Sequence, residues 1–161
     1  MTENFVDAQS EYQSLEQLPQ GAILAFDFGK SRIGVAIGNN TLGIARPLVT
    51  IDSEVTERRF AMIAQLIETW QPVLLVVGLP MNSDGTAHEL TQLSQRFARR
   101  LAGRFNLKII LKDERYTSQT ASAALREAGI TGRKQKLVLD QVAAQQILQS
   151  FFDEQHAITG R

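Results

Sequence analysis

The chain has 161 residues, of which 43% are hydrophobic and 21% charged, as expected for a single soluble globular domain. No apolar run approaches the ~20 residues that a membrane span requires, and the first residues lack the basic start and apolar core of a signal peptide. The absence of cysteine excludes disulfides, thiolate catalysis and cysteine-zinc sites, and it fits a cytoplasmic protein.

The formal net charge is zero, but the charges are distributed unevenly along the chain. Residues 1–21 contain four acids and no base, whereas residues 96–136 contain eleven bases and three acids. A basic half of this kind suggests a polyanionic partner. A set of solvated helix faces would give the same count, so the charge alone leaves both interpretations open.

Composition divides the chain into three parts. Residues 1–20 are polar and acidic, which predicts a flexible extension. The apolar patterns that predict a folded domain lie within residues 21–153, and residues 154–161 are expected to form a polar tail.

The domain is expected to begin with three strands. Residues 21–28 form an almost continuous apolar run, typical of a strand that is covered on both faces. Two further strands are predicted over residues 33–38 and 43–51, with a turn at Asn39-Asn40. The short connections make these three strands an antiparallel meander.

Helices and strands alternate in the rest of the predicted domain. In chain order we expect a helix over 52–70, a strand over 73–79, a helix from a capping box of Thr86 and Glu89 to Gly103, a strand over 107–111, a helix over 117–128, a basic loop over 129–136 and a last helix over 137–152. A meander followed by alternating elements predicts an α/β fold, with a mixed five-stranded sheet and helices on both faces.

Asp27 stands at the end of the first apolar strand. Because side chains alternate along a strand, Ile23, Ala25 and Asp27 share one face. An ionised carboxylate among apolar neighbours requires a metal ion, a basic side chain or backbone N–H groups to compensate it. Gly29 in the following turn would let a ligand approach the backbone. The alternative is an aspartate that only caps the turn.

Asp140 is the polar member of an apolar helical stripe. Asp140, Ala144, Ile147 and Phe151 recur at steps of four, three and four residues, so they lie on one face of a helix. The carboxylate therefore points toward the core, although it could instead cap a helix that begins one residue later.

Asp113 and Glu114 follow the strand predicted over residues 107–111, and the spacing does not choose between them. One of them could converge with Asp27 and Asp140. Three carboxylates without histidine or cysteine favour a hard cation such as Mg²⁺ or Mn²⁺. Beside a basic surface, this set predicts metal-assisted hydrolysis of a phosphodiester.

Five pieces of the sequence together resemble one protein family. They are FDFGKSRIGVAIGN at 26–39, ARPLVTI at 45–51, VVGLPMNSDGT at 76–86, DERYTSQTA at 113–121 and LDQVAAQQILQSF at 139–151. In this order they resemble the YqgF family of pre-16S rRNA nucleases, which are also described as Holliday-junction-resolvase-like proteins. The resemblance extends from about residue 22 to residue 152.

The resemblance implies an RNase H-like fold and a catalytic, metal-binding set of Asp27, Glu114 and Asp140. Within the DER motif it favours Glu114 over Asp113. It also implies divalent-metal-dependent cleavage of nucleic acid, with maturation of the 5′ end of 16S rRNA as the biological role.

One departure from many RNase H-like nucleases concerns the fourth strand of the predicted sheet. That strand ends at Gly78-Leu79-Pro80, where those enzymes carry an acid. The resemblance implies that Glu114 on the neighbouring strand takes this place, and Asp84 in the next loop is a candidate accessory residue.

Several basic residues are candidate contacts to a nucleic-acid backbone. They are Lys30, Arg32, Arg115, Arg133, Lys134 and Lys136. For each of them the alternative is an ordinary solvated surface.

We expect a nuclease that acts on structured RNA, the 16S precursor in particular, and that is a monomer or a weak dimer without membrane contact. Two alternatives stay open. The first is a resolvase of four-way DNA junctions, which needs a dimer because it cuts symmetrically. The second is an RNA-binding module without catalysis, and replacing Asp27 distinguishes it from an enzyme.

Overall fold

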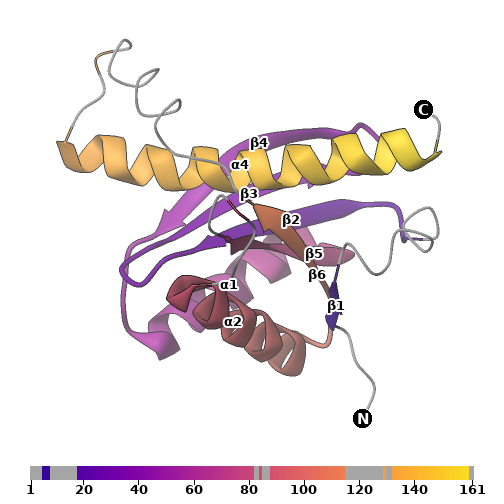
Figure 1. The fold of residues 1–161 in the computed structure, drawn as a ribbon. Helices are drawn as coiled ribbons and strands as arrows, with labels where there is room; N and C mark the ends of the chain where they lie inside the picture. The colour runs from indigo at the N-terminus through magenta and orange to yellow at the C-terminus, as the bar shows by residue number, and fades with distance from the viewer. Residues whose placement is uncertain are drawn as a thin grey trace.

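The computed structural model describes residues 5–7, 18–81, 84, 88–114, 129 and 132–159. Six strands in this part of the chain form one mixed sheet, in the order β1-β6-β5-β2-β3-β4 (Figure 1). Their bounds are β1 Phe5–Asp7, β2 Ala22–Phe28, β3 Ile33–Asn39, β4 Ile44–Ile51, β5 Leu74–Pro80 and β6 Lys108–Glu114.

The five expected strands are confirmed, and a sixth lies at the edge of the sheet. Strands β2, β3 and β4 form the expected antiparallel meander, while β5 pairs in parallel with both β2 and β6. The additional strand β1 pairs in parallel with β6, with Phe5 opposite Ile109. These three residues therefore belong to the sheet, although the sequence placed them in a flexible extension.

The helices cover both faces of the sheet, as expected. Helices α1 (Thr56–Trp70) and α2 (Glu89–Phe105) lie on one face, and the long helix α4 (Gly132–Thr159) crosses the other (Figure 1). Each face has its own apolar core, and the two cores contain alternate residues of the same strands. Burial on both sides explains why β2 and β5 read as continuous apolar runs.

The ends of α1 and α2 differ from the prediction. Helix α1 begins at Thr56, four residues after the expected start, because its N-cap is Val55. Helix α2 begins at Glu89 with His88 as N-cap, since His88 Nδ1 accepts the Leu90 N–H at 3.2 Å. The predicted capping box with Glu89 is therefore wrong, and Thr86 lies outside the described residues. Helix α2 also runs past Gly103 to Phe105.

Helix α4 is longer at both ends than predicted. The expected basic loop over residues 129–136 is helical from Gly132 onward, and the expected polar tail is helical as far as Thr159. Polar anchors hold the early turns, since Thr50 of β4 donates to the carbonyl of Leu137 at 2.5 Å. The helix predicted over residues 117–128 lies outside the described residues.

No helix in the described ranges is long and apolar enough to span a membrane.

Candidate active site

The register of the sheet places Asp27 and Glu114 on the same face. Ala25 of β2 and Ile110 of β6 both pack into the apolar core beneath α4. Because alternate residues of a strand share a face, Asp27 and Glu114 also lie on the α4 side. Asp113 belongs to the opposite face. Strand geometry thus selects Glu114 from the pair that the spacing left open.

Gly34 brings Asp140 close to Asp27. Gly34 lies opposite Asp27 in the pairing of β3 with β2. A Cβ atom added at Gly34 would lie 1.8 Å from the main-chain oxygen of Asp140, so α4 contacts the backbone of β3 here. Asp140 is in the interior of α4, which excludes the alternative that it caps the start of that helix.

The three carboxyl groups interact electrostatically. Burial raises the pKa of Asp27 to about 7, and the negative charges of Asp140 and Glu114 raise it further in the same direction. An acid whose ionised form is destabilised by its surroundings gains most from a nearby cation. The sheet edge at the end of β2 is therefore a place where positive charge is stabilising.

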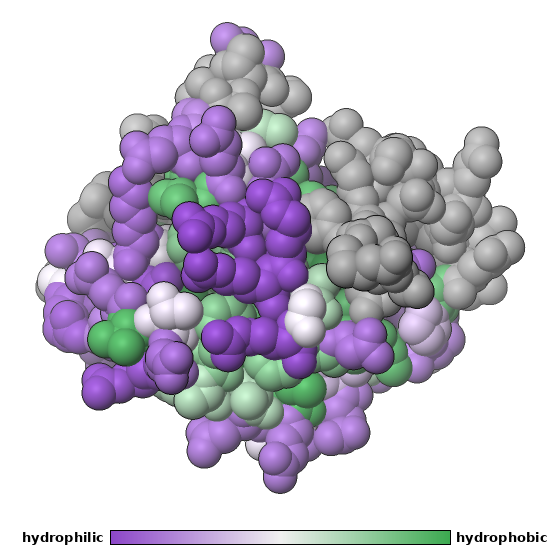
Figure 2. Space-filling model, turned by 90° about the horizontal axis from the view of Figure 1, so that it is seen from below, coloured by the Kyte–Doolittle hydropathy of each residue, from purple (hydrophilic) through white to green (hydrophobic). Residues whose placement is uncertain are grey.

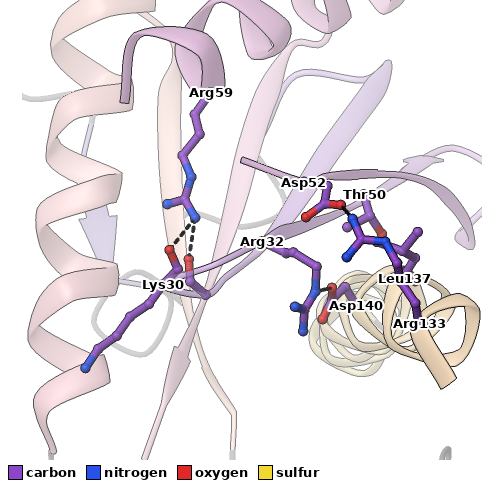
Figure 3. A network of polar contacts seen from close by, with 9 residues as sticks. Lys30, Arg32, Thr50, Asp52, Arg59, Arg133, Leu137 and Asp140 are labelled. Carbon is purple, nitrogen blue, oxygen red and sulfur yellow. Dashed lines mark hydrogen bonds and ion pairs between the residues drawn. The ribbon is translucent and has the colours of Figure 1, made fainter. Parts of the chain in front are cut away.

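A basic side chain meets part of this demand. Arg32 Nε lies 2.7 Å from Asp140 Oδ2, and both groups are partly buried (Figure 3). Among the described residues, no three acid or histidine side chains are close enough to hold a metal ion in their present positions. The donor set nevertheless fits Mg²⁺ or Mn²⁺, because Asp27, Glu114 and Asp140 offer only carboxylate oxygens.

Arg59 holds the turn between β2 and β3, although the sequence analysis did not single it out. Its Nη2 donates to the carbonyls of Gly29 at 2.9 Å and Lys30 at 2.8 Å (Figure 3), and its Nε donates to the carbonyl of Ser53. The side chain is only 7% exposed, and burial lowers its pKa. A signal was present, since Arg59 lies one helical turn before the buried Ile63 on the apolar stripe of α1.

A cavity of about 470 Å³ opens beside Asp140. Its walls are the turn over residues 29–32 and the start of α2 at residues 88–90. Lys30 Nζ and Glu89 Oε1 form an exposed ion pair of 2.7 Å across it. The hydrogen bond and the charge of Lys30 lower the pKa of Glu89. The cavity has room for a phosphate group next to the carboxylates.

The other predicted contacts lie farther along α4 or outside the described residues. Arg133 forms an ion pair with Asp52, which follows β4 (Figure 3). Lys134 and Lys136 are exposed on the first turns of α4. Asp84 is exposed in a turn after β5, and its accessory role stays a prediction. Arg115 is outside the described ranges.

Relatives of this chain cover most of its length. A protein of Nitrosomonas eutropha is 62% identical over 85% of this chain and 87% of the relative. One of Methylobacillus flagellatus is 64% identical over 83% and 92%, and one of Nitrosospira multiformis is 57% identical over 92% and 99%. All three carry the name "Putative pre-16S rRNA nuclease".

Among solved structures, Thermus thermophilus RuvC is similar to 86% of this chain over 96% of its own, at 12% identity and a TM-score of 0.49. One family, described as "RuvX: Holliday junction resolvase", matches residues 21–154. The RNase H-like fold expected from the resemblance agrees with the sheet order above. The chain therefore belongs to the RuvX family, which is the YqgF family that its motifs resemble.

Proposed function

We propose that this protein is a divalent-metal-dependent nuclease that hydrolyses phosphodiester bonds, with the 5′ region of the 16S rRNA precursor as its substrate. The observation that carries the proposal is the placement of Asp27, Glu114 and Asp140 on the α4 side of one sheet edge. The names of the relatives support the choice of RNA substrate.

In this proposal Asp27, Glu114 and Asp140 hold Mg²⁺ or Mn²⁺. A bound divalent ion supplies activation of a water nucleophile and stabilisation of the leaving oxygen. The turn over residues 29–32 binds the phosphate, because it lines the cavity beside Asp140 and carries Lys30 and Arg32. Arg59 keeps this turn in place through its main-chain carbonyls.

The test is cleavage of a labelled 16S precursor fragment and a DNA four-way junction, each with Mg²⁺, Mn²⁺ or EDTA. We expect metal-dependent cleavage of the RNA. Cutting of the junction alone would favour the resolvase that the family description suggests. Tight RNA binding with no cleavage of free or ribosome-bound precursor would favour a binding module.

Replacing Arg32 by Gln should affect metal binding and catalysis in opposite directions. The guanidinium competes with a metal ion for Asp140, so we expect Mn²⁺ to bind several-fold more tightly to the variant. Cleavage should slow by about tenfold, because a charge-assisted contact to phosphate is worth roughly 1.5–3 kcal/mol. Calorimetric titration of Mn²⁺ and cleavage rates measure the two effects.

Arg133→Gln is the matched control, since Arg133 pairs with Asp52 instead of the candidate metal ligands. It should leave Mn²⁺ affinity unchanged. Weaker Mn²⁺ binding in Arg32→Gln would mean that Arg32 orients Asp140 and does not compete with the metal.

A further inference from the structure

A second cavity lies on the opposite face of the sheet from α4, between α1 and α2. Its volume is about 170 Å³, well below the roughly 300 Å³ at which pockets for drug-sized ligands begin. The lining includes Phe28 together with Phe60 and Phe97, which are each 4% exposed and so form the inner wall. The cavity therefore offers an apolar wall to a group no larger than a single ring system.

Positive charge surrounds the mouth of this cavity. Arg96 and Arg100 line it from α2, and both are exposed. Because they are four residues apart, their side chains lie on one stripe of the helix. Figure 2 shows this face of the molecule, where hydrophilic side chains gather around small apolar areas. None of the ion pairs within the described residues involves Arg96 or Arg100.

The buried side of the cavity is also basic. Arg59 lines it, and the recorded hydrogen bonds of its guanidinium go to main-chain carbonyls. Thr56, in the first turn of α1, lines it as well, and the N-cap Val55 makes no side-chain hydrogen bond to that turn. The first-turn N–H groups of α1 add partial positive charge on the same side.

The cavity and the candidate active site share one structural element. Phe28 lines the cavity and directly follows Asp27, while Arg59 is bonded to Gly29 and Lys30 of the turn that walls the active site. A strand of nucleic acid that places a phosphate beside Asp27 can therefore cross this turn and reach the cavity with a neighbouring nucleotide.

We infer that the cavity between α1 and α2 binds one unpaired nucleotide of the substrate next to the scissile phosphate. Its base lies against the apolar wall that includes Phe28, and its phosphate is bound by Arg96 and Arg100. Contact between a base and aromatic side chains tolerates any sequence, since every base has an apolar face. The inference rests on the proposed nuclease function, because it names how the same substrate is held.

The test measures binding without cleavage. Asp27→Asn protein in EDTA is titrated onto a short fluorescent single-stranded RNA, with and without the added pair Arg96→Ala and Arg100→Ala. We expect at least a tenfold loss of affinity from the pair. The slope of log K against log salt should fall by about 1.4, because each lost phosphate contact on a single strand removes about 0.7.

The matched control is the pair Arg58→Ala and Arg99→Ala in the same background. These residues are exposed on the same two helices, remove the same charge and do not line the cavity. The control should change affinity by less than threefold. An equal loss in both double variants would overturn the inference, since it would show attraction by the helix surface in general. An unchanged affinity in the Arg96 and Arg100 variant would also overturn it.

A single abasic site moved along the RNA tests the base contact. One position should weaken binding to the protein with intact arginines, and that effect should disappear in the Arg96 and Arg100 variant. Equal affinity at every abasic position would exclude a base in the cavity. Because no step requires cleavage, a failure of metal-dependent hydrolysis would overturn the proposed function without altering these binding results.

Discussion

Replacing Asp27 by Asn should abolish metal-dependent cleavage and at the same time make the protein more stable above pH 7. The carboxyl group has its pKa raised to about 7 by burial and by the charges of Asp140 and Glu114. Its ionised form is therefore a cost to the folded state in the absence of metal. Asparagine has nearly the same shape and removes that cost together with a metal ligand.

The pH dependence gives the sign of this effect. Between the ordinary value of 3.8 and about 7, the folded protein keeps a proton that the unfolded chain releases. The contribution of Asp27 to stability therefore falls as pH rises through this window and is lowest above pH 7. We expect Asp27→Asn to gain on the order of 2–4 kcal/mol at pH 8, and to gain nothing below about pH 4.

Urea unfolding of both proteins at pH 4 and pH 8, with and without Mg²⁺, measures the gain. Mg²⁺ should stabilise the wild-type protein at pH 8 by binding the folded state, and it should not stabilise Asp27→Asn. A variant that is less stable than wild type at pH 8 would show that Asp27 is compensated by the protein alone, and that it has no need of a cation.

Gly34→Ala should unfold or displace the start of the contact between α4 and the sheet. The added methyl group would lie 1.8 Å from the main-chain oxygen of Asp140, and a backbone atom of a packed helix cannot move aside cheaply. Overpacking of a core costs about 1–3 kcal/mol, and a clash with backbone should reach or exceed the upper value. Cleavage should fall by more than tenfold, because Asp140 moves away from Asp27. Thermal unfolding and cleavage rates measure both effects.

Gly103→Ala provides the control for this substitution. Gly103 lies within α2, and nothing is within 4 Å of the position where its Cβ would be. Alanine there should stabilise the helix by about 0.5–1 kcal/mol and leave cleavage unchanged. If Gly34→Ala behaved like Gly103→Ala, the close approach of α4 to β3 would not position Asp140.

Two of the three candidate acids could be found from sequence because each breaks an apolar pattern. Asp27 interrupts the face of a buried strand, and Asp140 interrupts a helical stripe whose other members, such as Ala144, are buried. Their convergence could not be predicted in the same way. It depends on Gly34, whose missing side chain lets α4 approach β3, and that contact joins residues far apart in the chain.

The choice of Glu114 over Asp113 required the true end of strand β6. The sequence appeared to end this strand at Leu111 because the next residue is the charged Lys112. In the structure Lys112 is 8% exposed and pairs with Glu154 of α4 at 2.9 Å, so the strand continues to Glu114. A buried ion pair with a distant helix leaves no local sequence signal. Arg59 was missed for the same reason, since its partners are carbonyls of another segment.

The most direct measurement compares Glu114→Gln with Asp113→Asn in the metal-dependent cleavage assay. The two residues are adjacent in sequence and both partly exposed, but alternate faces of β6 place only Glu114 on the side of Asp27 and Asp140. We expect Glu114→Gln to lose at least a hundredfold in cleavage rate and in Mn²⁺ affinity, while Asp113→Asn stays within threefold of wild type. Equal losses in both variants, or a larger loss in Asp113→Asn, would contradict a metal-dependent site built from Asp27, Glu114 and Asp140.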